Sequence, residues 1–170
     1  FVFEKKYDNL MIVAHPDDEI IFGGVDLINE DNNLVIVCTN DYSRQSMIDK
    51  VSKNLKFDYL ILDHIDTQIK NLRFHPKILD ILSEIILKQN WEKIITHNSE
   101  GEYGHPQHIL IHKIVSHLLH NLNCNNLFTF NENNKKKLDD KIIKIKSDNL
   151  KIYNRSPERW PQINYFISKK

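Results

Sequence analysis

The sequence has few cysteines, no net charge and no long hydrophobic run. Only two of its 170 residues are cysteines, Cys38 and Cys124, and their wide separation predicts no disulfide framework. Lys and Arg together number 23, as do Asp and Glu, so the overall charge does not favour nucleic acid or an anionic membrane surface as a partner. Any binding site must therefore be recognised from particular residues.

Membrane and export signals are also missing from the sequence. No uninterrupted apolar segment approaches the roughly 20 residues that cross a bilayer. The first residues lack the basic, apolar and small-residue series of a signal peptide. We therefore expect a soluble protein, cytoplasmic or otherwise intracellular, without an integral membrane segment. The length fits one domain over residues 1–170.

Apolar runs rich in Val and Ile alternate with longer segments of helical period. Strands are predicted at residues 9–15, 33–40, 58–64, 92–98 and 126–131. Helices are predicted at residues 17–31, 43–57, 75–91 and 105–122. This alternation predicts an α/β fold: a single-domain, Rossmann-like, doubly wound sheet that is mostly parallel, with helices on both faces.

The pattern becomes irregular after residue 130. Residues 131–141, NENNKKKLDDK, are polar and predict a solvated loop. The apolar spacing that follows favours a helix to about Tyr153, although the segment IIKIK could equally form a strand. Residues 155–162, RSPERWPQ, predict an irregular tail.

The stretch IVAHPDDEIIFGG, residues 12–24, runs from an apolar strand directly into a histidine and three acids. Ligands of open α/β sheets bind outside the carboxyl ends of the strands. Pro16 helps to turn the chain, so His15 and Asp18 can point at one location and supply half of a metal site, with Asp17 left to hold a water. Alternatively, the three acids only cap a helix and interact with its dipole.

A second pair of candidate ligands follows the fourth predicted strand. His105 and His108 stand three residues apart around Pro106, at the start of a predicted helix. His108 can supply the third ligand to a site with His15 and Asp18, which leaves a position open for water as catalytic zinc sites do. His105 then lies near the metal without binding it. Two His-Pro turns at strand ends are hard to explain as two helix caps.

Other residues near these motifs receive supporting roles. Glu19 is assigned to capping or to the support of a ligand. His112 follows His108 by four residues, but Ile109 replaces the glutamate of an H-E-x-x-H motif, so His112 is expected to support the site or face solvent. His97 is expected to be a hydrogen-bonded residue at the strand edge, with the orientation of a neighbour as the alternative. Four histidines are left out of the site: His64, His75, His117 and His120.

These motifs resemble those of the zinc-dependent de-N-acetylases of the PIG-L and LmbE type. AHPDDE at residues 14–19, with Gly23 and Gly24 after it, is similar to the first motif of that family, and YGHPQH at residues 103–108 is similar to the second. The resemblance covers residues 10–112 in motif order and strand placement. It implies one Zn²⁺ per chain, or another divalent transition metal, and removal of the N-acetyl group from an N-acetylglucosamine-type sugar conjugate.

The resemblance also implies a role for each motif residue. The implied zinc ligands are His15, Asp18 and His108. Asp17 would be the general base, His105 would stabilise the transition state, and Tyr103 would assist at the oxyanion. Arg44 is similar in position to a substrate-binding arginine, but Met47 stands where that arginine usually has a companion acid.

Two other functions stay open. A non-catalytic sugar or nucleotide-sugar binding domain would keep the fold and the metal site; Met47 favours it, as does Gln107, which replaces the common aspartate between the second-motif histidines. An unrelated metallohydrolase acting on another amide would keep the metal and change the substrate. For the deacetylase, the expected partner is a small-molecule or glycan substrate with an N-acetylated amino sugar, and a soluble glycan or glycoside is favoured.

Overall fold

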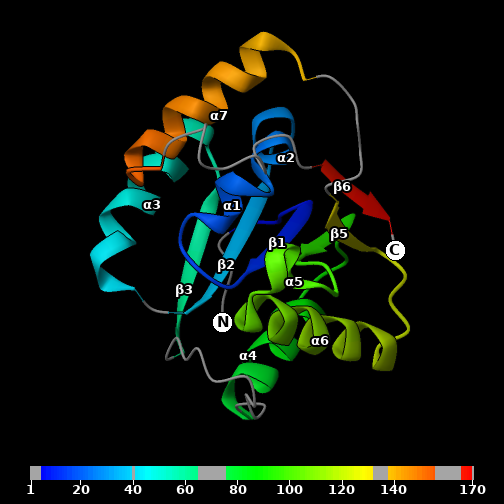
Figure 1. Cartoon of the computed structure of the whole chain (residues 1–170). Helices are drawn as coiled ribbons and strands as arrows, with labels where there is room; N and C mark the ends of the chain where they lie inside the picture. The colour runs from blue at the N-terminus through cyan, green and yellow to red at the C-terminus, as the bar shows by residue number, and fades with distance from the viewer. Residues whose placement is uncertain (1–4, 40, 65–75, 132–137, 156–165, 170) are drawn as a thin grey trace.

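The computed structural model describes residues 5–39, 41–64, 76–131, 138–155 and 166–169. Its strands form one six-stranded sheet in the order β3-β2-β1-β4-β5-β6 (Figure 1). The strands are β1 (Asn9–Val13), β2 (Asn33–Thr39), β3 (Asp58–His64), β4 (Lys93–Thr96), β5 (Leu127–Asn131) and β6 (Phe166–Lys169). All neighbours pair in parallel except β6, which is antiparallel to β5. The prediction of a mostly parallel α/β sheet is confirmed.

The helices lie on both faces of this sheet (Figure 1). They are α1 (Asp18–Ile21), α2 (Gly24–Asn29), α3 (Tyr42–Leu55), α4 (Pro76–Leu87), α5 (Gly101–Gly104), α6 (Pro106–Asn121) and α7 (Asp140–Ile152). Asp139 begins α7 by accepting a hydrogen bond from the Lys141 N–H, so the segment predicted as either helix or strand is a helix. No helix in the described part of the chain is long and apolar enough to cross a membrane.

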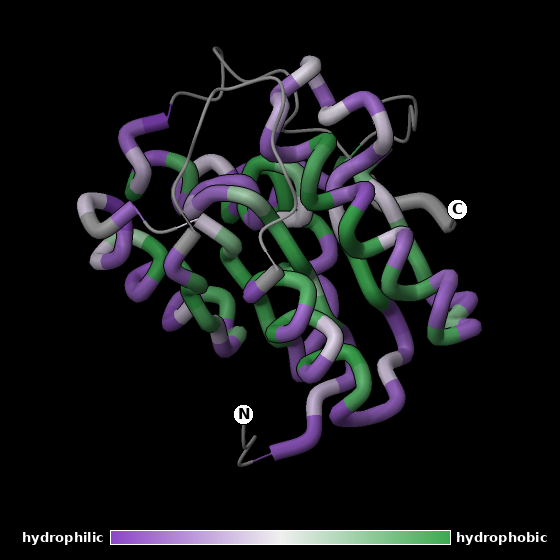
Figure 2. The backbone as a smooth tube through the Cα atoms, turned by 90° about the horizontal axis from the view of Figure 1, so that it is seen from below, coloured by the Kyte–Doolittle hydropathy of each residue, from purple (hydrophilic) through white to green (hydrophobic). Residues whose placement is uncertain are grey.

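Side chains of β1 alternate between two hydrophobic cores, because successive strand residues point to opposite faces. Leu10 and Ile12 belong to the core beneath α4 and α6, whereas Met11 and Val13 belong to the core beneath α1, α2, α3 and α7. Both faces are therefore covered, which explains why the central strands are apolar at nearly every position. Figure 2 shows hydrophobic stretches along the strands and the inner sides of the helices.

The predicted helix at residues 17–31 is divided into α1 and α2 around Gly23. A Cβ atom at Gly23 would overlap the side chain of Met11 in β1 and lie 3.0 Å from the Glu19 carbonyl oxygen. At Gly24 it would lie 2.9 Å from Ile20 Cδ1. The glycine pair thus allows close packing of this segment on the sheet.

The predicted loop and the predicted irregular tail of the C-terminal part can be compared with the structure only in part. Residues 132–137 of the predicted loop lie outside the described residues, as do residues 156–162 of the predicted irregular tail. Strand β6, farther along the chain, was not predicted.

The sheet changes winding direction between β1 and β4. From β1 the chain proceeds to β2 and β3 on one side, and β4 then lies on the other side of β1, with Ile12 paired to Thr96. The connections that follow β1 and β4 leave in opposite directions, and ligands of such sheets bind at this switch point. His15 follows β1 and His97 follows β4, so the sheet brings both predicted motifs to one crevice.

Candidate active site

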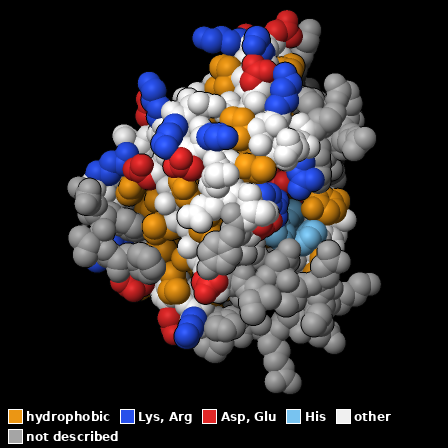
Figure 3. All heavy atoms as spheres, turned by 90° about the vertical axis from the view of Figure 1, so that its left-hand side faces the viewer, with side chains coloured by type: hydrophobic (Ala, Val, Ile, Leu, Met, Phe, Trp, Pro, Cys, Tyr) orange, Lys and Arg blue, Asp and Glu red, His pale blue; other side chains and the backbone are white. Residues whose placement is uncertain are grey.

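A small pocket of about 120 Å³ lies at the carboxyl ends of β1 and β4. The residues that line it are His15, Asp17, Asp18, Ile21, Arg44, Tyr103, His105 and Arg155. His108, the remaining predicted site residue, is fully buried at the start of α6. On the face drawn in Figure 3, histidine side chains are visible beside basic and acidic side chains. The topology therefore brings all seven predicted site residues together.

Asp18 is the meeting point of three imidazole rings. Its Oδ2 lies 3.2 Å from Nδ1 of His15, 3.3 Å from Nε2 of His108 and 3.5 Å from Nε2 of His97. It also accepts a hydrogen bond from the backbone N–H of His15 at 2.8 Å. Burial raises the pKa of Asp18, but His108 and His15 outweigh it and hold this pKa well below the usual range. The Asp18 side chain is therefore a buried, ionised carboxylate in contact with histidine ring nitrogens.

Two overlapping sets of side chains could hold a metal ion. One set is His15, His105 and His108, and the other is Asp18, His97 and His108. Nε2 of His108, which belongs to both sets, is buried and has no hydrogen-bond partner among the described residues. A buried imidazole nitrogen facing a carboxylate fits a transition metal with mixed nitrogen and oxygen ligands. The structure thus places His15, Asp18 and His108, the predicted ligands, side by side.

Glu102 is a site residue that was not predicted from the sequence. Its Oε2 accepts from Nδ1 of His108 at 2.6 Å and from Nδ1 of His97 at 2.8 Å, and its Oε1 accepts from the Asn98 N–H at 2.8 Å. Although burial acts in the opposite direction, the two histidines lower the pKa of Glu102 to about 2. A carboxylate on Nδ1 fixes the tautomer and leaves Nε2 available for a metal. The feature of the sequence that could have indicated Glu102 is its position directly before the Y-G-H-P-x-H motif.

His97 is held at both ring nitrogens. Nδ1 faces Glu102, and Nε2 accepts the Ala14 N–H at 2.9 Å. Its ring stacks on that of His108, with the ring centres 3.9 Å apart. His112 is buried behind it, with Nδ1 2.7 Å from the His97 carbonyl oxygen, so His112 supports the site and does not face solvent. His97 therefore combines the edge position and the orienting role that were considered for it.

Asp17 has two arginine partners and an unusual backbone. Its φ of 115° lies in the region that normally favours glycine. Its Oδ2 lies 2.9 Å from Nη1 of Arg44 and 2.7 Å from Nη2 of Arg155. Nε of Arg44 also donates to Asp41 at 2.7 Å, so the acid expected at position 47 has a substitute three residues before the arginine. Arg155 is a second site residue that was not predicted from the sequence.

Glu19 supports Asp17 from the opposite side. Its Oε2 accepts the Asp17 N–H at 2.8 Å and its Oε1 accepts the Tyr153 hydroxyl at 2.7 Å. The carboxyl group is fully buried, and burial raises its pKa to about 8. Glu19 thus supports the start of α1, as expected. Its carboxylate is also held by Tyr153, a residue that was not predicted to take part in the site.

Tyr103 and His105 form the mouth of the site. The ring centre of His105 lies 4.8 Å from that of His15 and 4.5 Å from that of His108. Tyr103 is half exposed, and its ring stands edge-on to both His105 and His108. These two side chains can therefore approach a bound molecule from the solvent side.

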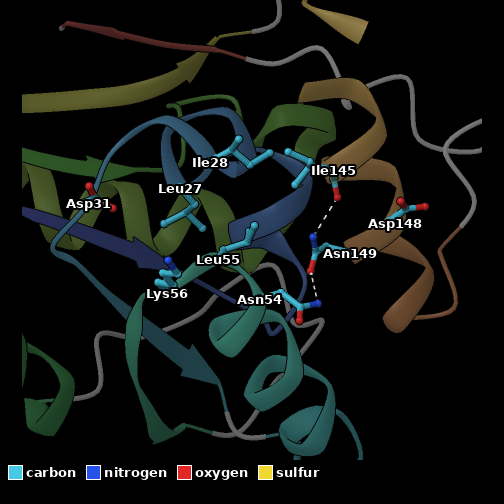
Figure 4. A pocket seen from close by; sticks show the side chains of 9 residues that line it. All are labelled: Leu27, Ile28, Asp31, Asn54, Leu55, Lys56, Ile145, Asp148 and Asn149. Carbon is cyan, nitrogen blue, oxygen red and sulfur yellow. Dashed lines mark hydrogen bonds between the residues drawn. The ribbon is translucent and has the colours of Figure 1, made fainter. Parts of the chain in front are cut away.

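A larger pocket of about 500 Å³ lies elsewhere, between α2, α3 and α7 (Figure 4). Asp31 and Lys56 precede β2 and β3, so this pocket is at the amino edge of the sheet. Asn54 donates to Asn149 across it at 3.0 Å (Figure 4). Neither group of potential metal ligands in the described residues includes a residue of this pocket. The smaller pocket is therefore the candidate active site.

Comparison with known proteins identifies sequence relatives. The model of the PIG-L family, described as GlcNAc-PI de-N-acetylase, matches residues 10–119. The uncharacterized protein L374 of Acanthamoeba polyphaga mimivirus is 34% identical over 146 residues, which cover 75% of this chain and 63% of the viral protein. The chain therefore spans less than two thirds of that relative.

Three solved structures share the fold at low identity. GalB, the 4-carboxy-2-hydroxymuconate hydratase from Pseudomonas putida KT2440, has a TM-score of 0.70 at 11% identity, covering 93% of this chain and 83% of its own. The N,N'-diacetylchitobiose deacetylase from Pyrococcus horikoshii has a TM-score of 0.68 at 13%, covering 95% and 84%. Dbv21, the deacetylase of the A40926 pseudoaglycone, has a TM-score of 0.66 at 12%, covering 88% and 82%.

Proposed function

Because this chain belongs to the PIG-L family of de-N-acetylases, we propose that it is a metal-dependent hydrolase acting on an N-acetylglucosamine-type sugar conjugate. The observation that carries the proposal is the meeting of the two motifs at one crevice, with Asp18 Oδ2 3.3 Å from Nε2 of His108. Of the structures with this fold, one is an N,N'-diacetylchitobiose deacetylase and another is the deacetylase of the A40926 pseudoaglycone. The products would be acetate and a free amino sugar.

The residues proposed to hold the metal are His15, Asp18 and His108. His97 is not proposed as a ligand, because its Nε2 already accepts the Ala14 N–H. Zn²⁺ suits this set of two imidazoles and a carboxylate; when bound, it polarises a carbonyl group and lowers the pKa of water to about 7. Another divalent transition metal would offer related chemistry.

Asp17 is proposed as the general base. A carboxylate in the pocket can accept a proton from the attacking water while the water oxygen forms a bond to the acetamide carbon. The C–N bond then breaks, and the amine nitrogen takes up the proton held by Asp17. Atoms and charge balance: one water and one amide give one carboxylic acid, ionised in water, and one amine.

The other predicted residues are proposed to act on the substrate. His105 and Tyr103, at the mouth of the pocket, can donate hydrogen bonds to the oxygen that becomes negative in the tetrahedral intermediate. Arg44 lines the same pocket and is held by Asp41, so it can contact the sugar from a fixed position. A soluble glycan or glycoside is the proposed substrate class.

Acetate release and metal content, measured on the same zinc-loaded sample, test this function. The substrates would be N-acetylglucosamine, N,N'-diacetylchitobiose and an N-acetyl amino acid, and the inactive control would be Asp17→Asn. We expect acetate from the acetylated sugars only, a normal zinc content in Asp17→Asn, and a loss of turnover of about 10²–10⁴-fold in that variant. Zinc or sugar binding without acetate release would favour a binding domain, and release from the amino acid alone would indicate another amidohydrolase.

A further inference from the structure

The contacts that Asp17 makes with arginine side chains, one hydrogen bond and two ion-pair contacts, all fall on one carboxylate oxygen. Oδ2 lies 2.8 Å from Nε and 2.7 Å from Nη2 of Arg155, and 2.9 Å from Nη1 of Arg44. No described residue donates a hydrogen bond to Oδ1. Because the hydrogen bond from Arg155 Nε and the two guanidinium ion-pair contacts all fall on Oδ2, Oδ1 is the oxygen that can take up a proton.

The segment that carries Arg155 also holds the backbone of Asp17. Glu19 accepts the Asp17 N–H, and Tyr153 donates to the same Glu19 carboxylate. Tyr153 and Arg155 are two residues apart, just beyond the end of α7. A backbone at φ 115° persists only where the surroundings fix it from several directions. The end of α7 thus restrains both the main chain and the side chain of Asp17.

Arg155 is itself placed by a packed element. Leu150 and Tyr153 are buried in the core shared with α1, α2 and α3. The Arg155 N–H donates to the Leu150 carbonyl oxygen at 3.1 Å. Residues 150–155 lie outside the matched family segment, residues 10–119. The restraint on Asp17 therefore comes from residues beyond the segment that the family model matches.

We infer that Arg155 is a positioning residue for hydrolysis, which with Arg44 holds Oδ2 of Asp17 so that Oδ1 accepts the proton of the attacking water. In that step the O–H bond of the water breaks, a new O–H bond forms at Oδ1, and the water oxygen bonds to the carbonyl carbon as the C=O π pair moves onto the carbonyl oxygen. The guanidinium groups neither gain nor lose a proton. This inference rests on the proposed deacetylase function.

The kinetic test uses the full chain, loaded with zinc, and N,N'-diacetylchitobiose as the probe. For Arg155→Ala we expect kcat to fall about 100-fold, because displacement of a catalytic group by about 1 Å costs that much. KM and zinc content should stay near the wild-type values. Arg155→Lys, or guanidinium added to Arg155→Ala at a non-denaturing concentration, should restore part of kcat. The matched control is Lys151→Ala, at an exposed cation near the end of α7 that pairs with Asp148.

A structural measurement keeps the inference independent of the substrate. Crystal structures of the wild type, Arg155→Ala and Lys151→Ala would show the Asp17 carboxylate displaced or disordered only in Arg155→Ala. An unmoved carboxylate would overturn the inference, as would a raised KM with unchanged kcat, which would make Arg155 a substrate-binding residue. If the wild type releases no acetate, the proposed function fails, and the crystal structures alone decide whether Arg155 positions Asp17.

Discussion

At the scale of single residues, the site depends on carboxylates that hold histidines in chosen orientations. Glu102 contacts two imidazoles at once and adopts φ 60°, ψ −64°, a rare conformation for a residue with a side chain. Its carboxylate reaches Nδ1 of His108 only because the backbone turns there. The same ring then presents Nε2 toward Asp18.

Replacing Glu102 by Gln is expected to weaken metal binding without unfolding the protein. Gln keeps the shape but removes the charge that holds His97 and His108, and loss of such a partner typically lowers metal affinity about 10–100-fold. A zinc competition titration against a chromophoric chelator measures the change. Glu100→Gln, at an exposed acid of the same loop, is the control and should keep wild-type affinity. Equal affinities in both variants would contradict the role of Glu102.

His105 and His108 are distinguished by their effects on metal content. Because His108 contacts Asp18 and His105 lies nearer the mouth, His108→Ala should lose zinc, whereas His105→Ala should retain it with depressed turnover. Atomic absorption on dialysed samples, together with acetate release, measures both properties. A zinc-free His105→Ala would show that the histidine set of His15, His105 and His108 binds the metal instead.

At the scale of elements, α7 packs a lysine into the core beside α2. Lys146 is fully buried, and a Cβ on Gly24 would lie 3.1 Å from its Cε. Burial lowers the pKa of Lys146 to about 7, although Asp26 acts in the opposite direction. Burial also raises the pKa of Asp26 to about 6. We therefore expect the contact between the two helices to depend on pH.

Lys146→Met is expected to raise the free energy of unfolding most at low pH. In the wild type, the folded-state pKa of Lys146 is lower than its unfolded-state value of 10.5. Between about pH 7 and 10.5 the unfolded chain therefore binds more protons, and stability rises with pH by up to about 1.4 kcal/mol per unit. Below pH 7 this slope vanishes and the full cost of the buried charge remains. The advantage of Lys146→Met should therefore shrink as the pH rises from 7 to 10.

Urea unfolding of the wild type and Lys146→Met at several pH values measures this difference. Lys144→Met, on the exposed side of α7, is the control, and its stability should run parallel to that of the wild type. If the free energy of unfolding of Lys146→Met also changed with pH in parallel with that of the wild type, the pKa of Lys146 would be the same in the folded and the unfolded state.

At the scale of the whole molecule, the site residues that could be predicted from the sequence are those close together along the chain, and those missed include residues far from their partners. The metal-ligand candidates lie in two short motifs, one directly after β1 and one after the loop and short helix α5 that follow β4, and apolar periodicity places those strands in one sheet. Arg155 and Tyr153 are 138 and 134 residues away from their partners, Asp17 and Glu19, so only the packing of α7 brings them together. Glu102 was missed because its contact depends on a non-helical backbone.

Strand β6 and the division between α1 and α2 were missed for related reasons. β6 is four residues long and takes its place at the edge of the sheet by pairing with β5, which local pattern does not reveal. The division around Gly23 follows from close approach to Met11, a contact with another element. Local pattern therefore predicted the elements and the motif residues, and tertiary contacts determined the supporting residues.

Metal binding at the switch point is expected to stabilise the entire fold, because its ligands come from both halves of the sheet. A ligand that binds only the folded state at 100 times its Kd adds about 2.7 kcal/mol. For a chain of this length that corresponds to a rise in Tm of roughly 5–10 °C. Thermal unfolding with EDTA and with excess Zn²⁺ measures the shift. His108→Ala should abolish it, and His117→Ala, at an exposed histidine of the same helix, should retain it. An equal shift in all three proteins would place the bound zinc outside this site, since His108 is the one nitrogen ligand common to both possible metal sets in the described chain.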